Sequence, residues 1–210
     1  MTKTGNAQAR PYHHGDLSRA LVEAARRILE SEGPEGLSLR AVAREAGVSP
    51  AAPYHHFKDK NELLDAVAEQ GWTALGEAMS QAKARSSSAQ EAVINIGMAY
   101  VGFAVRNPAL YRLMYECART RTDLPERLRQ EEQGFDVVER AVREAGGQVV
   151  DPMDLRLSAI AAWCAAHGLA EMATFRQFDA IKGELGGAEN FVRGVLQHIN
   201  VFQRKAANCP

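Results

Sequence analysis

The sequence has few cysteines, few aromatic residues and no long apolar run. Cys117, Cys164 and Cys209 are odd in number and lie far apart without a Cys-x-x-Cys pair, which argues against a disulfide framework and a zinc knuckle. Only 7% of the residues are aromatic, while helix-forming Ala, Leu, Glu, Arg and Gln are plentiful. This composition disfavours a β sandwich.

The apolar runs are too short to cross a membrane. Residues 93–105 form one of the longest, and Asn95 and glycines interrupt it, so it falls short of the roughly 18 consecutive apolar residues of a membrane span. Residues 1–6 are polar, where a secretory signal would be apolar. We therefore expect a soluble cytoplasmic protein with no membrane partner.

Charge is balanced overall but not along the chain. The formal net charge is -1 over 210 residues, a length that suits one or two domains. Residues 1–60 carry nine Lys and Arg against seven Asp and Glu, and residues 61–210 carry 16 against 19. Four of the six histidines also lie in the first part. This asymmetry is weak evidence for an anionic partner.

Hydrophobic periodicity predicts an all-α fold, with no convincing period-two segment. The predicted helices cover residues 16–31, 39–46, 50–57, 60–83, 89–106, 108–115, 124–145, 152–175 and 188–205. A polar break at residues 85–88 separates short helices from long ones. We expect an N-terminal arm at 1–15, a first domain with short helices at 16–83 and a C-terminal domain with long helices at 84–210.

The second and third predicted helices have the spacing of a helix-turn-helix. Ser38 suits an N-cap, and Gly47 suits the C′ position, where positive φ is favoured. Ser49 can cap the next helix with Pro50 at its first position, where a missing N–H costs nothing. A short turn between two helices of this length is typical of DNA-binding proteins.

The third predicted helix is unusual for a structural element. Its first turn is nearly bare, and Tyr54, His55 and His56 precede a single apolar anchor, Phe57. Small residues allow close approach to a groove, and the polar rings can reach phosphates. An ordinary helical corner with a histidine-rich surface is the alternative. Metal binding by His13-His14 or His55-His56 is disfavoured because adjacent helical residues diverge by about 100°.

Residues 16–64, and especially 37–49 and 54–64, resemble the N-terminal domain of the TetR family of bacterial transcriptional regulators. The resemblance implies an all-α fold with an N-terminal three-helix DNA-binding domain and a C-terminal helical domain for ligand binding and dimerisation. It implies that Ser38 and Arg40 open the second helix at a double-stranded DNA operator. It also implies groove-facing residues at Pro50, Ala51, Ala52 and Tyr54, and phosphate contacts from Tyr54, His56 and Lys60.

Pro53 departs from the family pattern, which usually has an apolar, Leu-like residue there. A proline lacks one backbone donor, so we expect the helix to survive with a tightened first turn. With alanines at 51 and 52, direct base hydrogen bonding looks sparse. Specificity would then depend on Arg40, on thymine methyl contacts and on DNA shape. Residues 1–15 are either an arm that contacts phosphates or the minor groove, or a tail without a role.

The two long C-terminal helices carry apolar stripes that predict a homodimer. The stripes comprise Leu155, Ala159, Ala162, Ala166 and Ala170 on one helix, and Phe191, Val195, Leu196, Ile199 and Phe202 on the other. Two-fold symmetry would place two recognition helices about one DNA turn apart on a pseudo-palindrome.

Residues 163–169, Trp-Cys-Ala-Ala-His-Gly-Leu, resemble the TetR subgroup named for a Trp-His-Gly pattern. Trp163 and His167 stand four apart on one helical face, where they could share a pocket wall. The alternative is that Trp163 is core and His167 is a buried, hydrogen-bonded histidine.

A pocket for a small-molecule effector is implied by the family together with a set of apolar residues that have a few polar tips. The candidates are Tyr100, Phe103, Met114, Tyr115, Cys117, Trp163 and His167. In TetR-like proteins a kink such as Asn107-Pro108 lies where ligand binding moves the fourth helix. We expect a repressor that its ligand releases from DNA.

Two other functions compete with this one. An enzyme could use Cys164 and His167 as nucleophile and base, but no orienting Asp or Asn accompanies them. We therefore expect no catalytic residue, metal or cofactor. A TetR-like module that binds a ligand or a protein and has lost operator binding is the second alternative, since Pro53 and the alanines leave room for it.

Overall fold

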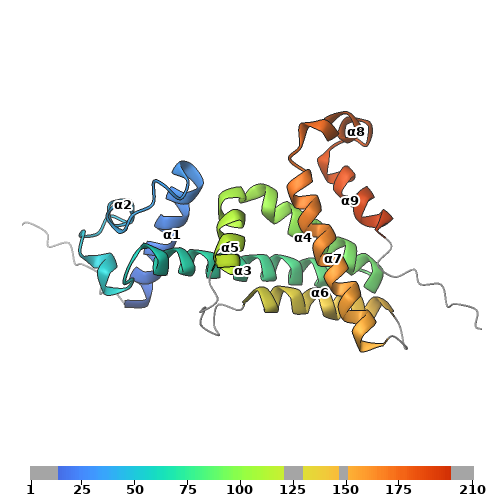
Figure 1. The fold of residues 1–210 in the computed structure, drawn as a ribbon, viewed down its shortest axis with the longest axis horizontal. Coiled ribbons are helices and arrows are strands. Elements are labelled where there is room, and N and C mark those ends of the chain that lie inside the picture. Colours follow the sequence, from blue (N-terminus) through green and yellow to red (C-terminus); the bar gives the residue numbers. More distant parts are fainter. Residues whose placement is uncertain (1–13, 121–129, 147–150, 200–210) are drawn as a thin grey trace, which may run out of the picture. The chain divides into compact units, whose positions relative to one another are not determined.

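Figure 1 shows the fold in a computed structural model, which describes residues 14–120, 130–146 and 151–199. Within these ranges the secondary structure is helical and no strand occurs, which confirms the all-α prediction. The chain forms two compact units, the first ending at Val67 and the second beginning at Ala68. The described residues contain no helix long and apolar enough to span a membrane.

The first unit consists of α1 (His14–Glu32), α2 (Leu39–Glu45), η1 (Ala52–His55) and the start of α3 (Lys60–Ala84). α1 packs against α2, and α2 packs against η1. Apolar side chains at helical spacing fill the core between them, namely Leu21, Ala24, Ala25, Ile28, Leu29, Leu37, Leu39, Val42, Ala43, Phe57, Leu63 and Val67. An exposed ion pair between Arg27 and Glu45, 2.7 Å long, also joins α1 to α2.

Side-chain caps start the helices of the first unit where the sequence predicts. Ser38 Oγ accepts a hydrogen bond from the Ala41 N–H at 3.1 Å, and Asp59 Oδ1 accepts one from the Glu62 N–H at 3.0 Å. These caps satisfy backbone donors that a helix leaves unpaired in its first turn. The starts of α2 and α3 are therefore set locally.

The second unit contains the rest of α3 followed by α4 (Ala89–Arg106), α5 (Pro108–Thr120), α6 (Gln130–Gly146), α7 (Pro152–Met172), η3 (Arg176–Phe178), α8 (Asp179–Glu184) and α9 (Ala188–His198). α4 is the central helix, since it packs against α5, α6, α7 and α9. α6 also packs against α7, and α8 against α9. This arrangement surrounds α4 with apolar side chains.

Most boundaries agree with the predicted ones, apart from the segment 50–57, which is described below, and the following differences. α5 runs on to Thr120, five residues beyond the predicted end at Tyr115, and α7 ends at Met172 rather than Phe175. η3 and α8 were not predicted. The last predicted helix is wrong at its C-terminal end, because α9 ends at His198 and the backbone of Ile199 is extended. The predicted start of the helix at 124 lies outside the described residues.

Candidate DNA-binding surface and ligand cavity

The turn after α2 has the geometry that Gly47 predicts. Gly47 has φ +69°, and its N–H donates to the Arg44 carbonyl at 3.2 Å. The Val48 N–H donates to the Ala43 carbonyl at 2.9 Å. Together these are the two hydrogen bonds of a Schellman motif, which ends a helix and redirects the chain. The prediction that Gly47 occupies the C′ position is confirmed.

The third predicted helix is not an α-helix in the structure. The segment forms the four-residue 3₁₀ helix η1, and no side chain caps it, so the predicted capping role of Ser49 is wrong. Its backbone bonds join residues three apart, from Ala52 to Ser49 at 3.0 Å, from Tyr54 to Ala51 at 3.2 Å and from His56 to Pro53 at 3.0 Å.

The two prolines of this segment explain its tighter winding. Pro50 and Pro53 supply no backbone donor, so an α-helix over this segment would lack the hydrogen bonds that their N–H groups would make. We predicted that only the first turn would tighten. The 3₁₀ pattern instead runs through the whole of η1, since short 3₁₀ pieces tolerate the missing donors.

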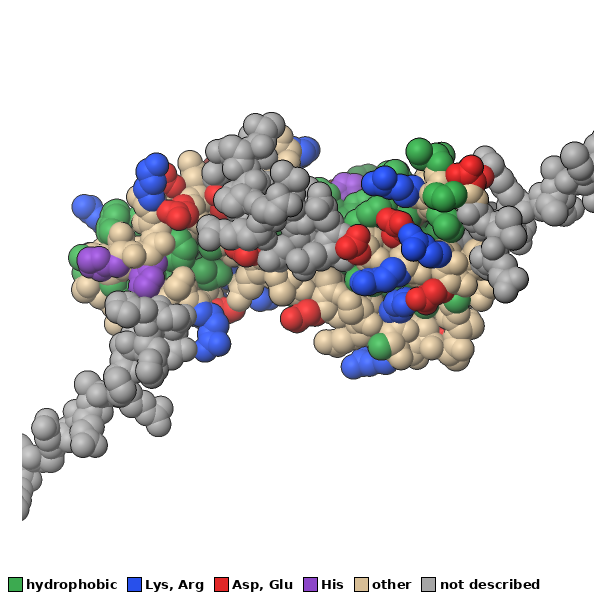
Figure 2. Space-filling view, turned by 90° about the horizontal axis from the view of Figure 1, so that it is seen from below, with side chains coloured by type: hydrophobic (Ala, Val, Ile, Leu, Met, Phe, Trp, Pro, Cys, Tyr) green, Lys and Arg blue, Asp and Glu red, His purple; other side chains and the backbone are tan. Residues whose placement is uncertain are grey.

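The side chains of η1 and of the residues beside it differ in exposure. Pro53 and Phe57 are buried, whereas Tyr54 keeps 55% of its surface exposed. The other residues proposed for DNA contact are exposed or half-buried. Ser38, Arg40, Pro50, Ala51 and His55 are exposed, and Ala52, His56 and Lys60 are half-buried. Figure 2 shows histidine side chains gathered on the surface. The predicted DNA-contacting residues therefore remain accessible around a buried anchor.

Lys60 makes a hydrogen bond within the protein in addition to its predicted contact with a DNA phosphate. Its Nζ donates to the Pro34 carbonyl at 2.7 Å. This bond ties the first residue of α3 to the loop between α1 and α2. The ammonium group has further donors that could still meet a phosphate.

In the second unit, three tyrosines and a histidine form one hydrogen-bonded cluster. The Tyr100 hydroxyl contacts the hydroxyls of Tyr111, at 3.1 Å, and Tyr115, and it lies 3.1 Å from His167 Nδ1. The Tyr111 hydroxyl lies 2.6 Å from the same nitrogen. Burial raises the pKa of Tyr100 and of Tyr111 above the ordinary value of 10.0. Both phenols therefore keep their protons and can donate them within the cluster.

The cluster joins three helices and extends into the surrounding rings. Tyr100 comes from α4, Tyr111 and Tyr115 from α5, and His167 from α7. The Tyr115 ring meets the Trp72 ring edge-on, with centroids 5.1 Å apart, and the Tyr100 and Trp163 centroids lie 5.2 Å apart. Edge-to-face contacts of this kind stabilise an aromatic core.

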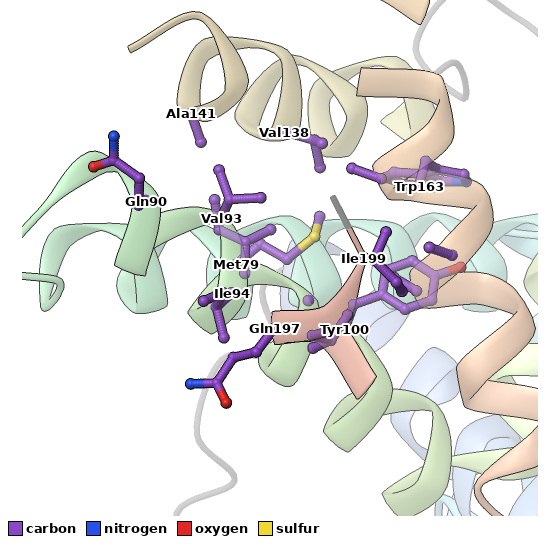
Figure 3. A pocket seen from close by; sticks show the side chains of 16 residues that line it. Met79, Gln90, Val93, Ile94, Tyr100, Val138, Ala141, Trp163, Gln197 and Ile199 are labelled. Carbon is purple, nitrogen blue, oxygen red and sulfur yellow. The ribbon is translucent and has the colours of Figure 1, made fainter. Parts of the chain in front are cut away.

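An apolar cavity of about 280 Å³ lies beside this cluster, within the second unit (Figure 3). Of the seven candidate ligand residues, Tyr100 and Trp163 line it. The described lining does not include Tyr115 or His167, which belong to the hydrogen-bonded cluster, nor Phe103, Met114 or Cys117. Met114 is fully buried and packs close to Gly71.

Most of the lining was missed from sequence. It comes from α3, α4, α6, α7, α9 and Ile199, and the unpredicted members are Met79, Gln90, Val93, Ile94, Ile96, Gly97, Val138, Ala141, Ala162, Ala165, Ala166, Leu196, Gln197 and Ile199. Small residues bring the helices together around the space. A Cβ at Gly97 would lie 3.0 Å from Leu196 Cδ1, and one at Gly134 would lie 3.2 Å from Met79 Cε. Clusters of Ala and Gly on facing helices were the available signal.

Several residues of the two apolar stripes predicted for dimerisation are used inside the chain instead, whereas Leu155 and Val195 are half-buried and their part in an interface stays a prediction. Ala159, Ala166 and Ala170 are buried within the chain itself, as is Phe191, while Leu196 and Ile199 line the cavity. Phe202 lies outside the described residues. The outer face of α7 instead exposes Met153 (61%), Leu157 (55%) and Ile160 (47%). α7 is apolar on two sides, so its sequence pattern alone could not show which side faces the core and which side is exposed.

The groups considered for metal binding or catalysis do not assemble. Among the described residues, no three His, Cys, Asp or Glu lie close enough together to hold a metal ion. The His13-His14 pair lies outside the described side chains. Cys164 is exposed, whereas His167 Nδ1 lies among the tyrosine hydroxyls.

Comparison with known proteins covers both units. Residues 21–67 match the family model described as bacterial regulatory proteins, tetR family, and residues 93–194 match one described as tetracyclin repressor-like, C-terminal domain. The HTH-type transcriptional regulators Rv1816 of Mycobacterium tuberculosis (strain ATCC 25618 / H37Rv) and Mb1846 of Mycobacterium bovis are each 36% identical over 101 residues, which is 47% of this chain. The match spans 43% of the length of these curated relatives.

Solved structures share the fold over nearly the whole chain. A protein of unknown function from Rhodococcus sp. RHA1 is 35% identical with a TM-score of 0.72, covering 90% of this chain and 96% of that one. The transcriptional regulator FadR from Bacillus subtilis, in complex with stearoyl-CoA, has a TM-score of 0.62 at 14% identity, covering 88% and 97%. The latter likeness concerns the fold alone.

Proposed function

We propose that this chain, which belongs to the TetR family of bacterial transcriptional regulators, is a repressor that a small apolar molecule releases from a pseudo-palindromic operator. The observation that carries the proposal is the surface around η1, where Tyr54 is exposed directly after a helix and a Schellman turn. In this proposal residues 16–83 bind DNA and residues 84–210 bind the ligand and dimerise. Residues 1–13 of the predicted arm lie outside the described residues, and α1 already begins at His14.

The proposed DNA contacts follow from which side chains are accessible. Ser38 and Arg40 stand at the start of α2, with Arg40 exposed beside the capped helix end. Pro50 and Ala51 lie just before η1, and Tyr54 lies within it. All three are exposed, so in this proposal they face a groove of the DNA. The alanine and the prolines offer no base-specific hydrogen bond, so we propose that phosphate contacts and DNA shape supply most of the affinity.

We propose that two copies associate through α7 and the last helix, using the outer face of α7. Met153, Leu157 and Ile160 follow one another at helical spacing on this face, and Cys164 continues it. An exposed apolar stripe of this kind suits a self-complementary two-fold interface. The resulting dimer would place two η1 segments on half-sites about one DNA turn apart.

The cavity is the proposed effector site. Its described lining is almost entirely apolar, and the stearoyl-CoA complex of FadR supports the view that a fold of this kind can hold a ligand with an apolar chain. Trp163 lines the cavity and His167 lies in the adjacent cluster, which supports placing the chain in the Trp-His-Gly subgroup. The effector releases DNA to the extent that it binds the low-affinity state of the dimer more tightly.

The test is binding to the DNA upstream of the protein's own gene across a salt series. If the dimer makes about six phosphate contacts, its affinity should fall about 10³-fold between 50 and 200 mM salt. Absent or salt-insensitive binding would favour the alternative, a ligand-binding module without an operator. The shortness of η1, only four residues, is the observation that favours that alternative.

A further inference from the structure

We propose that the effector is a single-chain amphiphile that enters the cavity tail first and leaves its head group in water at Gln90, and that Trp163 limits the length of its chain. This inference rests on the proposed function, because it names the molecule that the cavity receives. It follows from a gradient of exposure along the cavity wall, from two rings at the inner end, and from the cost of burying a head group.

The α4 wall of the cavity changes from exposed to buried along its length. Five of its lining residues share one helical face, namely Gln90, Val93, Ile94, Gly97 and Tyr100. Gln90 is exposed, the next two are half-buried, and the last two are buried. Ten residues of helix, from Gln90 to Tyr100, span about 15 Å. The cavity therefore has a mouth at Gln90 and an inner end at Tyr100.

The mouth is exposed to solvent and holds no preformed site for a head group. Gln197 from α9 also lines the cavity and is exposed. Figure 3 shows the Gln90 and Gln197 side chains pointing out of the cavity and apart. A head group at this position keeps most of its hydration, whether it is charged or neutral. The mouth therefore does not select the head group.

Two aromatic rings stand at the inner end of the cavity, on the side opposite Gln90 in Figure 3. The rings of Tyr100 and Trp163 meet edge-on, with centroids 5.2 Å apart and planes at 71°. The Tyr100 hydroxyl contacts His167 and two other tyrosines, and the Trp163 ring also meets Phe135 at 6.0 Å. Neither ring can move aside without losing these contacts. The pair therefore limits how far a chain can extend.

The chemistry of the inner end sets the direction of entry. Figure 3 shows the Tyr100 oxygen and the Trp163 nitrogen on the far sides of their rings from Val93. A head group placed there would lose its hydration without meeting a free partner, which is costly. A terminal methyl group instead gains from the burial of its apolar surface. The tail therefore lies at the inner end and the head group at the mouth.

The size of the cavity suits one chain. About 280 Å³ is near the lower end of the roughly 300–1,000 Å³ typical of small-molecule sites. Straight-chain alkanoates from hexanoate to tetradecanoate are suitable probes of chain length, because they differ in nothing else. Decanoate, 1-decanol and decyltrimethylammonium share one chain length and differ in the charge of the head group.

The first experiment is calorimetric titration of the full-length protein, without DNA, with each probe at pH 7 and about 150 mM salt, which screens surface charge. Alkanoate affinity should rise about fourfold for each added CH₂ group and stop rising at a limiting length within the series. The three ten-carbon probes should bind within about threefold of one another, because their head groups stay hydrated.

Three results would overturn the proposal: a larger difference between head groups, an affinity that does not depend on chain length or rises through the whole series, and the absence of binding by every probe. Operator binding is measured separately. Failure here therefore leaves the proposed DNA binding standing, and failure there leaves this result standing.

The second experiment moves the inner end of the cavity. Trp163→Leu should raise the limiting length by at least about two carbons, because the smaller side chain leaves room where the ring was. Ala166→Leu should lower it, because Ala166 is buried, lines the cavity and lies one turn after Trp163 on α7. The two changes act in opposite directions, so either variant tests the placement if the other does not fold.

Gln90→Ala is the matched control for these variants, since Gln90 also lines the cavity but lies at its exposed mouth. It should leave the limiting length unchanged. Thermal unfolding of each variant shows which of them are folded. The wild-type limiting length in the folded inner-end variants, or an equal shift from Gln90→Ala, would contradict the proposed direction of the chain.

Discussion

The two units use their tyrosines in opposite ways. In the first unit Tyr54 is 55% exposed on a four-residue 3₁₀ helix and depends on buried neighbours for its position. In the second unit Tyr100 and Tyr111 are buried and share hydrogen bonds with Tyr115 and His167. In the first unit, removing an exposed side chain should therefore impair function without lowering stability, because the core stays closed. In the second unit, removing a buried tyrosine should impair function and stability together.

The largest expected effect is on dimerisation, through the apolar face of α7 that the second unit leaves exposed. Leu157→Asp would bury an unpaired carboxylate from each copy at the proposed two-fold interface of α7. We expect the dimer dissociation constant to rise at least about 1,000-fold, which corresponds to about 4 kcal/mol, measured by analytical ultracentrifugation. Val105→Asp is the matched control, because Val105 is also an exposed apolar residue (46%) but lies on α4. A Leu157→Asp protein that stays dimeric would refute this interface.

The next effect tests the contrast inside the first unit. Phe57 is 4% exposed and is the apolar anchor after η1. Phe57→Ala should lower the free energy of unfolding by about 3–4 kcal/mol, because it leaves a cavity in the core. Tyr54→Ala should change it by less than about 0.5 kcal/mol, as most exposed substitutions do. Denaturant unfolding measures the free energy of unfolding of both variants. Similar losses in the two variants would contradict the distinction between Phe57 as a buried anchor and Tyr54 as an exposed residue for DNA contact.

The smallest effect concerns pH and the buried tyrosines. Burial raises the pKa of Tyr100 and Tyr111 in the folded protein above the value of 10.0 expected when they are exposed. Their contribution to stability is therefore complete below pH 10 and declines above it, since the unfolded chain then releases protons that the folded chain retains. At pH 11 the loss is about 1.4 kcal/mol per tyrosine.

The control for this pH dependence is a phenylalanine in place of each tyrosine. Tyr100→Phe and Tyr111→Phe remove the titrating group but keep the ring, so each should flatten the decline between pH 9 and 11 by that amount. Urea unfolding at the two pH values measures it. A decline as steep as in the wild type would show that these phenols do not cause it.

Much of the fold could be predicted because the signals that start and end helices are local. Ser38, Asp59 and Gly47 each act through backbone groups only a few residues away, so their roles can be inferred from the sequence itself. The form of η1 could not be inferred as readily. It depends on the combined effect of Pro50 and Pro53, and each proline alone is compatible with the start of an α-helix.

The cavity was less predictable because it depends on which faces of several helices meet. The alanines of α7 were assigned to an interface between copies, but Ala159, Ala166 and Ala170 are buried within the chain, and Ala162 and Ala166 line the cavity. Small apolar residues suit both a close helix crossing and a cavity wall. Only the packing of α4 and α6 against α7 decides between them.

The central claim is that the surface around η1 binds operator DNA, and Tyr54→Ala tests it most directly. The affinity of this variant and of the wild type for the upstream DNA fragment should be compared by footprinting, with dimerisation and thermal unfolding measured on the same samples. We predict at least about a 100-fold loss of affinity with the dimer and its unfolding unchanged. A Tyr54→Ala dimer that protects the operator as the wild type does would contradict the account.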